Sequence, residues 1–130
     1  QIQTYMEHFP QGDSIVRAQE LLDELNNKLE EKDYRICILY YRMENYNAAI
    51  TSFENLLKKY PNTPHREEIL CDMAKTYYDY AENSVPEKKK ERYEACIERY
   101  NTLGYLYPES AKLKEVAAVA EKARKKLENL

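Results

Sequence analysis

The sequence predicts an all-α protein built from stacked antiparallel helical hairpins. Three aromatic-proline pairs, Phe9-Pro10, Tyr60-Pro61 and Tyr107-Pro108, divide the chain at separations of 51 and 47 residues. Proline disfavours the helical conformation in the residue before it and cannot continue a helix, so each pair predicts a helix end. The 130 residues include only two glycines, and 43% of them are apolar. Those apolar residues recur in steps of three and four, which is typical of amphipathic helices.

A helix start is expected shortly after each of these helix ends. A hydroxyl side chain follows each pair within four residues, at Ser14, Thr63 and Ser110. Such a side chain can accept a hydrogen bond from a free backbone N–H group in the first turn of the next helix. A helix end followed at once by a helix start, repeated along the chain, indicates stacked hairpins, and repeat architectures typically serve as binding scaffolds.

The first half of the chain contains two expected helical stretches. Residues 14–43 contain neither Gly nor Pro, which predicts one long helix or two helices hinged at the polar pair Lys32-Asp33. Glu44-Asn45 is the expected turn before a helix over residues 46–60.

The second half is expected to contain three more helices. Thr63-Pro64 places a hydroxyl at the N-cap and proline at the first helical position of one of them. The segment Ser84-Val85-Pro86-Glu87 has the pattern of a capping box and should begin the next, which ends at Tyr107. Ser110 should begin the last.

Charge and composition exclude several classes of protein. The net charge of −3 gives no electrostatic footprint for nucleic acid. Residues 110–130 carry six basic and three acidic residues, a bias that is typical of a solvated helix face. No uncharged apolar run approaches the length of a membrane span. Cys37, Cys71 and Cys96 are odd in number, widely spaced and set among apolar positions, so we interpret them as small buried thiols.

Nothing in the sequence predicts catalysis, and we expect no cofactor, no metal and no small-molecule substrate. The two glycines, Gly12 and Gly104, are isolated, so no phosphate-binding loop is available. His65, Glu68 and Asp72 have a spacing that a metal could use, but His and Glu at a helix start are ordinarily solvated or capping residues.

Two stretches resemble the tetratricopeptide repeat when they are aligned on its final proline. Reading back from Pro61 gives Leu56, Phe53, Ala49 and Tyr46, and reading back from Pro108 gives Leu103, Tyr100, Cys96 and Tyr93. The resemblance implies a tetratricopeptide-like solenoid with a partial repeat over residues 1–31 and a repeat over 32–63. A second repeat over 64–109 has a long link over residues 80–90, and residues 110–130 form a terminal helix.

The whole chain resembles a narrower family, the BamD tetratricopeptide lipoproteins of the outer-membrane β-barrel assembly machinery, in the form found in Bacteroides-type bacteria. The resemblance rests on the order of these elements: Phe9-Pro10 with Ser14, Lys32-Asp33-Tyr34, Tyr40-Tyr41, Tyr46-x-Ala48-Ala49-Ile50, Tyr60-Pro61 and Ser84-x-x-Glu87-Lys88-Lys89-x-x-Arg92-Tyr93. The last of these is the most discriminating. The chain would correspond to the C-terminal half of such a protein.

This resemblance implies a non-catalytic scaffold on the periplasmic side of the outer membrane. Its expected partners are the barrel-forming assembly protein and unfolded outer-membrane proteins. None of the three cysteines can be the lipidated N-terminal cysteine of the family, so membrane attachment would come only from a lipid anchor upstream of this chain. The alternative is a general tetratricopeptide adaptor that binds a peptide or protein partner.

A partner surface is expected on the first helix of each hairpin, which by analogy with tetratricopeptide repeats lines the concave face. Tyr and Arg are enriched at interface hot spots. The residues that this analogy selects for protein binding are Tyr34, Ile38, Tyr41 and Arg42 in one repeat and Lys75, Tyr78 and Asp79 in the next.

Overall fold

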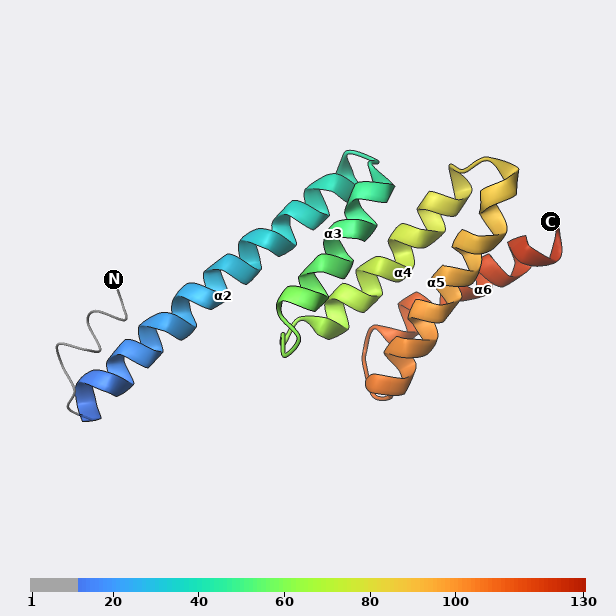
Figure 1. The fold of residues 1–130 in the computed structure, drawn as a ribbon. Coiled ribbons are helices and arrows are strands. Elements are labelled where there is room, and N and C mark those ends of the chain that lie inside the picture. Colours follow the sequence, from blue (N-terminus) through green and yellow to red (C-terminus); the bar gives the residue numbers. More distant parts are fainter. Residues whose placement is uncertain (1–11) are drawn as a thin grey trace. The chain divides into compact units, whose positions relative to one another are not determined.

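The computed structural model describes the backbone from Gly12 to Leu130 and the side chains from Ile15 onward (Figure 1). The described chain contains five helices: α2 (Gly12–Arg42), α3 (Tyr46–Lys59), α4 (Arg66–Glu82), α5 (Pro86–Leu106) and α6 (Leu113–Glu128). The predicted all-α, tetratricopeptide-like fold is therefore confirmed. The Phe9-Pro10 pair and the whole first third of the predicted partial repeat lie outside the described residues.

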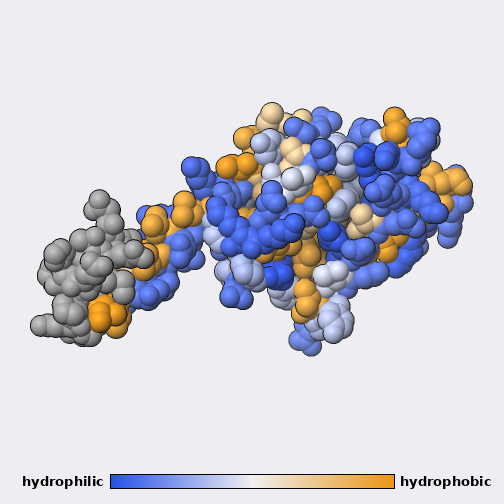
Figure 2. Space-filling view, viewed as in Figure 1, coloured by the Kyte–Doolittle hydropathy of each residue, from blue (hydrophilic) through white to orange (hydrophobic). Residues whose placement is uncertain are grey.

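Helix α2 is a single uninterrupted helix of 31 residues, so the alternative of two helices hinged at Lys32-Asp33 is wrong. The chain divides into two compact units, residues 1–35 and 36–130, and α2 contributes to both. The part of α2 in the first unit exposes several apolar side chains, and apolar patches are visible along this helix in Figure 2. These exposed side chains are Ile15, Val16, Leu21, Leu25 and Leu29. None of the described helices combines the length and apolar character needed to cross a bilayer.

The aromatic-proline pairs at 60–61 and 107–108 end helices as predicted. Tyr60 is the C-cap of α3, and its N–H donates to the Leu56 carbonyl at 2.9 Å. Tyr107 is the C-cap of α5, and its N–H donates to the Leu103 carbonyl at 2.8 Å. The two helix ends therefore have the same local structure, which is what a repeated sequence signal should produce.

The helix starts that follow are also alike. The Thr63 hydroxyl accepts a hydrogen bond from the His65 N–H, and the Ser110 hydroxyl accepts one from the Lys112 N–H, both at 3.1 Å. The predicted cap positions are wrong, however, because the N-caps of α4 and α6 are His65 and Lys112, and neither helix has a side-chain cap. Each hydroxyl instead stabilises a turn before the helix. The α-helical hydrogen bonding begins only at Arg66 in α4 and at Leu113 in α6.

The second hairpin differs from the sequence prediction at its link. The long link expected over residues 80–90 is wrong, because α4 continues to Glu82 and α5 begins at Pro86. The additional residues lengthen the two helices, which pack on each other more extensively than any other described pair. Proline occupies the first turn of α5, where its missing N–H costs no hydrogen bond.

The predicted capping box at Ser84 is also wrong. The N-cap of α5 is Val85, and no side chain caps it. The Ser84 hydroxyl donates instead to the Tyr80 carbonyl and accepts a hydrogen bond from Arg92. The hydroxyl is therefore used to link the end of α4 to α5.

The turn predicted at Glu44-Asn45 is present. Glu44 has a positive φ of 61°, and the side chain of Asn45 accepts a hydrogen bond from the Ala48 N–H at 3.4 Å. This turn reverses the chain between the end of α2 and α3. Both described hairpins are thus closed by three-residue links, residues 43–45 and 83–85.

The core of residues 36–130 includes two clusters of buried side chains. One cluster contains the buried Leu70, Cys71, Ala74, Leu103 and Val116, which come from α4, α5 and α6. A second cluster joins the far ends of the same helices through Ala81, Tyr93, Cys96 and Ala123. All three cysteines are buried free thiols, as predicted, and burial raises the pKa of Cys96 to about 12. The limits of the individual repeats stay a prediction.

Candidate functional site

Four of the residues predicted to bind a partner line one hollow. This groove pocket has a volume of about 310 Å³ and lies between the end of α2 and α4, with Phe53 of α3 in its wall. Ile38, Tyr41 and Arg42 come from α2, and Lys75 comes from α4. Sequence analysis did not select the other lining residues, which are Phe53, Asp72 and Thr76. Phe53 is a core residue with 0% exposure.

Tyr41 and Asp79 form a hydrogen bond that joins α2 to α4. The Tyr41 hydroxyl donates to the Asp79 carboxylate. Burial and this hydrogen bond to an anion both favour the neutral phenol, so the pKa of Tyr41 is raised. Asp79, which was predicted for the same surface, therefore contributes by fixing the position of Tyr41. The side of the groove formed by α2 is held in place by this contact.

Lys75 is held in place by a contact with α6. Its ammonium group forms a hydrogen-bonded ion pair with Glu115 near the start of α6. Burial lowers the pKa of Lys75, but the hydrogen bond to Glu115 and the nearby acidic groups together outweigh that effect, so the net shift is upward. Lys75 thus remains a cation whose charge is largely matched inside the protein. The ion pair fixes its side chain where it lines the groove pocket.

Arg42 differs from these neighbours because its guanidinium group makes no hydrogen bond or ion pair within the described part of the chain. It is exposed, and it occupies the last turn of α2. A guanidinium group offers five N–H donors in a planar arrangement suited to a carboxylate. The groove pocket therefore combines an apolar wall, a fixed phenol and one unpaired planar cation.

Tyr78 lies elsewhere. Its hydroxyl donates to Glu82 at 2.9 Å, and its ring packs against Tyr93 with centroids 5.8 Å apart. Burial and the hydrogen bond to Glu82 raise the pKa of Tyr78 to about 12. Because it packs against the second core cluster between α4, α5 and α6, Tyr78 does not line the groove pocket.

Tyr34 belongs to the first compact unit, residues 1–35, and is half-buried there. The structure therefore brings Ile38, Tyr41, Arg42, Lys75 and Asp79 together. Whether any of the seven predicted residues binds a partner stays a prediction.

Sequence analysis also missed an aromatic series beside the groove. Tyr41 contacts Tyr46 edge-on at 5.9 Å, and Tyr46 lies 6.2 Å from Tyr80, with both distances measured between ring centroids. The Arg92 guanidinium group lies over the Tyr80 ring at 3.7 Å from its centroid. The series crosses from α2 to α5 and fixes the turn end of the groove. The tyrosine-rich composition was its only signal in the sequence.

The fold and this site can be set beside known proteins. A sequence model of the YfiO family, described as outer membrane lipoprotein, matches residues 1–90. The chain belongs to this family. That result confirms the predicted family and the location at the outer membrane, on the side facing the periplasm. The correspondence to the C-terminal half and the Bacteroides-type form stay predictions.

Two relatives are similar over shorter shares of their own lengths. The chain is 30% identical over 78 residues to the outer membrane protein assembly factor BamD of Buchnera aphidicola, which covers 60% of the chain and 32% of the relative. It is 27% identical over 114 residues to the RNA polymerase-associated protein CTR9 of Saccharomyces cerevisiae, covering 85% of the chain and 10% of that protein. The matched regions thus span about a third of BamD and a tenth of CTR9.

Proposed function

We propose that this chain is a non-catalytic, protein-binding part of the machinery that assembles outer-membrane β-barrel proteins. Membership of the YfiO family and the similarity to an outer membrane protein assembly factor support this proposal. In this role it docks on the barrel-forming assembly protein and helps the insertion of unfolded outer-membrane proteins. Binding uses shape and hydrogen-bond complementarity and involves no covalent step.

The groove pocket is the docking surface in this proposal, and Arg42 is the observation that carries it. The neighbouring polar groups already have partners within the chain, Tyr41 with Asp79 and Lys75 with Glu115. An incoming protein therefore meets a rigid surface on which one guanidinium group is still free to pair. Preorganised side chains of this kind lose little conformational entropy on binding.

The test is binding to the purified periplasmic domains of the barrel-forming assembly protein. Replacing both Tyr41 and Arg42 by alanine should weaken binding by about tenfold or more, because truncating interface Tyr and Arg side chains commonly costs above 1 kcal/mol each. Circular dichroism should show that the helices are retained. The matched control is Arg124→Ala on α6, an exposed arginine that is paired only with Glu121. Equal affinity for the double variant and the wild type would remove the groove from the proposal.

A general adaptor is the second candidate. The match to CTR9 favours it, because that match covers 85% of the chain and CTR9 is named as an RNA polymerase-associated protein, not as an outer-membrane protein. In this case the groove pocket binds a peptide unrelated to barrel assembly. Depleting the full-length protein from its cells separates the candidates. Loss of folded outer-membrane barrels supports the assembly role, whereas normal barrels with another binding defect support the adaptor.

A further inference from the structure

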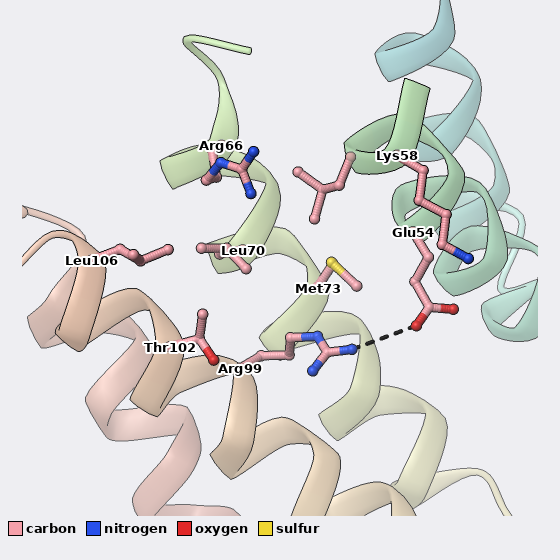
Figure 3. Close-up of a pocket in the computed structure, with 9 residues that line it drawn as sticks. Glu54, Lys58, Arg66, Leu70, Met73, Arg99, Thr102 and Leu106 are labelled. Carbon is pink, nitrogen blue, oxygen red and sulfur yellow. Dashed lines mark hydrogen bonds and ion pairs between the residues drawn. The ribbon is translucent and has the colours of Figure 1, made fainter. Parts of the chain in front are cut away.

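A second hollow, here called the basic pocket, lies between α3, α4 and α5. It has a volume of about 280 Å³. Figure 3 shows side chains from the three helices converging on it. Leu57, Leu70 and Met73 form its apolar part, and Leu70 and Met73 are buried to 4% and 1% exposure. Such a surface can accept an apolar side chain of a partner.

Three cations surround this apolar part, and only one of them is matched by an acid. Arg99 pairs with Glu54 at 3.5 Å, as the dashed line in Figure 3 shows, and with Glu98 at 2.7 Å. Arg66 donates to the backbone carbonyl of Pro61, which carries no charge. Lys58 is exposed and forms no hydrogen bond or ion pair with any described residue. The pocket is therefore cationic in a chain whose net charge is −3.

The basic pocket is separate from the groove pocket. Helix α4 contributes Asp72, Lys75 and Thr76 to the groove pocket, but Arg66, Leu70 and Met73 to the basic pocket. At 100° per residue these two sets fall on different faces of α4.

The wall contributed by α5 also lies beyond residue 90, where the family match ends. Arg99, Thr102 and Leu106 form this wall. The family match therefore covers only the part of the basic pocket that α3 and α4 form.

We propose that the basic pocket docks an acidic segment of a protein partner, with an apolar side chain of that segment entering between Leu57, Leu70 and Met73. Carboxylates on either side of that side chain pair with Lys58 and Arg66. Charge complementarity selects the segment, because an approaching cation meets an uncompensated positive rim whereas an anion is attracted to it. The exposed Leu106, at 45% exposure, extends the apolar surface at the edge of the pocket.

The probe for this proposal is the capped peptide acetyl-Glu-Leu-Asp-Leu-Glu-amide. It is titrated into the chain while methyl NMR resonances of Leu57, Leu70 and Met73 are followed. We expect saturable shifts with a Kd on the order of 0.1–1 mM, which is reasonable for a few buried side-chain atoms and two exposed ion pairs. Raising the salt concentration should weaken binding, because salt screens exposed charges.

Two control peptides separate the apolar and the charged contributions. Replacing both leucines by serine keeps the charge and removes the apolar side chains, and replacing the acids by lysine reverses the charge. Both changes should abolish the saturable shifts at the basic pocket. Binding of either control peptide as tightly as the probe would overturn the proposal.

The protein variants test the same contacts from the other side. Lys58→Glu should raise the Kd of the probe peptide by about fivefold, and Arg66→Gln should raise it by a similar factor, since each removes one cation from the rim of the pocket. The matched control Lys122→Glu makes the same charge change on α6, outside the pocket, and should leave the affinity unchanged. The folding of each variant is checked from its methyl spectrum without peptide.

Other occupants give distinct results. Equal binding of decanoate, with the same dependence on Lys58, would assign the pocket to a fatty acid and overturn the protein-segment proposal. Dimerisation of the chain alone that is lost in Lys58→Glu would assign it to a second copy. Probe shifts confined to Ile38 would place the binding in the groove pocket and would also overturn the proposal. None of these results depends on the assembly role proposed above.

Discussion

The two pockets beside α4 differ in how their charges are satisfied. In the groove pocket, Tyr41 is hydrogen-bonded to Asp79 and Lys75 is paired with Glu115, so internal contacts use most of the polar groups. In the basic pocket, Lys58 lacks a partner among the described residues and Arg66 bonds only to a neutral carbonyl. The first surface is fixed by its own network, whereas the second has an excess of positive charge.

Because of this difference, the two surfaces should respond differently to mutation. Removing a side chain that is hydrogen-bonded within the groove pocket leaves its partner without a hydrogen bond, so it should lower the free energy of unfolding. Removing an unpaired exposed cation should cost almost none and should affect only binding. Measurements of folding stability should therefore separate the two pockets.

The largest effect is expected at the wall of the groove pocket. Phe53 is fully buried, and Phe53→Ala should lower the free energy of unfolding by about 3–5 kcal/mol because it removes a large core side chain and leaves a cavity. Urea denaturation followed by circular dichroism measures this change. A loss below about 1 kcal/mol would show that the groove wall is not part of the core.

The Tyr41–Asp79 hydrogen bond should have an intermediate effect. Tyr41→Phe keeps the ring and removes the hydroxyl, so it should lower the free energy of unfolding by about 1–2 kcal/mol, as expected for a half-buried bond to a carboxylate. In a double-mutant cycle with Asp79→Ala, which removes the acceptor, most of that loss should disappear. Independent, additive losses would mean that the bond does not hold α2 to α4.

A smaller effect is expected from the Lys75–Glu115 ion pair, and it depends on pH. The hydrogen bond from Lys75 lowers the pKa of Glu115 below its usual value. A group with a lowered pKa in the folded state stabilises fully above its unfolded pKa of about 4.3, and that contribution is lost as the pH falls through the folded pKa. Glu115→Gln should therefore flatten the loss of stability between about pH 5 and pH 3.

Glu115→Gln should flatten the loss of stability at acid pH only in part. The pKa of Glu82 is lowered as well, by hydrogen bonds from Tyr93 and Tyr78, so Glu82 also contributes to that loss. Denaturation midpoints measured across this pH range give the slope. A slope identical to that of the wild type would contradict a folded-state role for the ion pair.

The smallest effect is expected at the basic pocket. Lys58→Gln should change the free energy of unfolding by no more than about 0.5 kcal/mol, since the side chain is exposed and unpaired. The same denaturation assay compares it directly with Tyr41→Phe. A clear destabilisation by Lys58→Gln would break the contrast between the two pockets.

The sequence predicted those parts of the fold that are determined locally. The ends of α3 and α5 at Tyr60 and Tyr107 follow from the proline after each tyrosine, a constraint that acts on one residue. The hydroxyl contacts of Thr63 and Ser110 span only two residues and were also predictable.

Features that depend on packing were not predictable in the same way. Ser84 has a capping sequence, but Arg92 and the Tyr80 carbonyl use its hydroxyl because α4 and α5 pack closely along their full lengths. The same packing converts the expected long link into helix.

The candidate site likewise has parts that the sequence predicted and parts that depend on packing. The repeat analogy predicted that Ile38, Tyr41 and Arg42 share a surface with Lys75 from the next hairpin, and all four line the groove pocket. It also selected Tyr78, whose hydroxyl donates to Glu82 and which does not line the groove pocket. The basic pocket was missed because Glu54 and Arg99 are 45 residues apart and meet only through the stacking of α3, α4 and α5.

The most direct test of the central claim is site-specific photo-cross-linking in cells. The full-length protein carries p-benzoylphenylalanine in place of Ile38, and a control carries it in place of Lys122 on α6. If the groove pocket is the docking surface, irradiation should give an adduct with the barrel-forming assembly protein from position 38 and none from position 122. An adduct from position 122 alone, or no adduct at position 38 in a functional protein, would contradict the proposal.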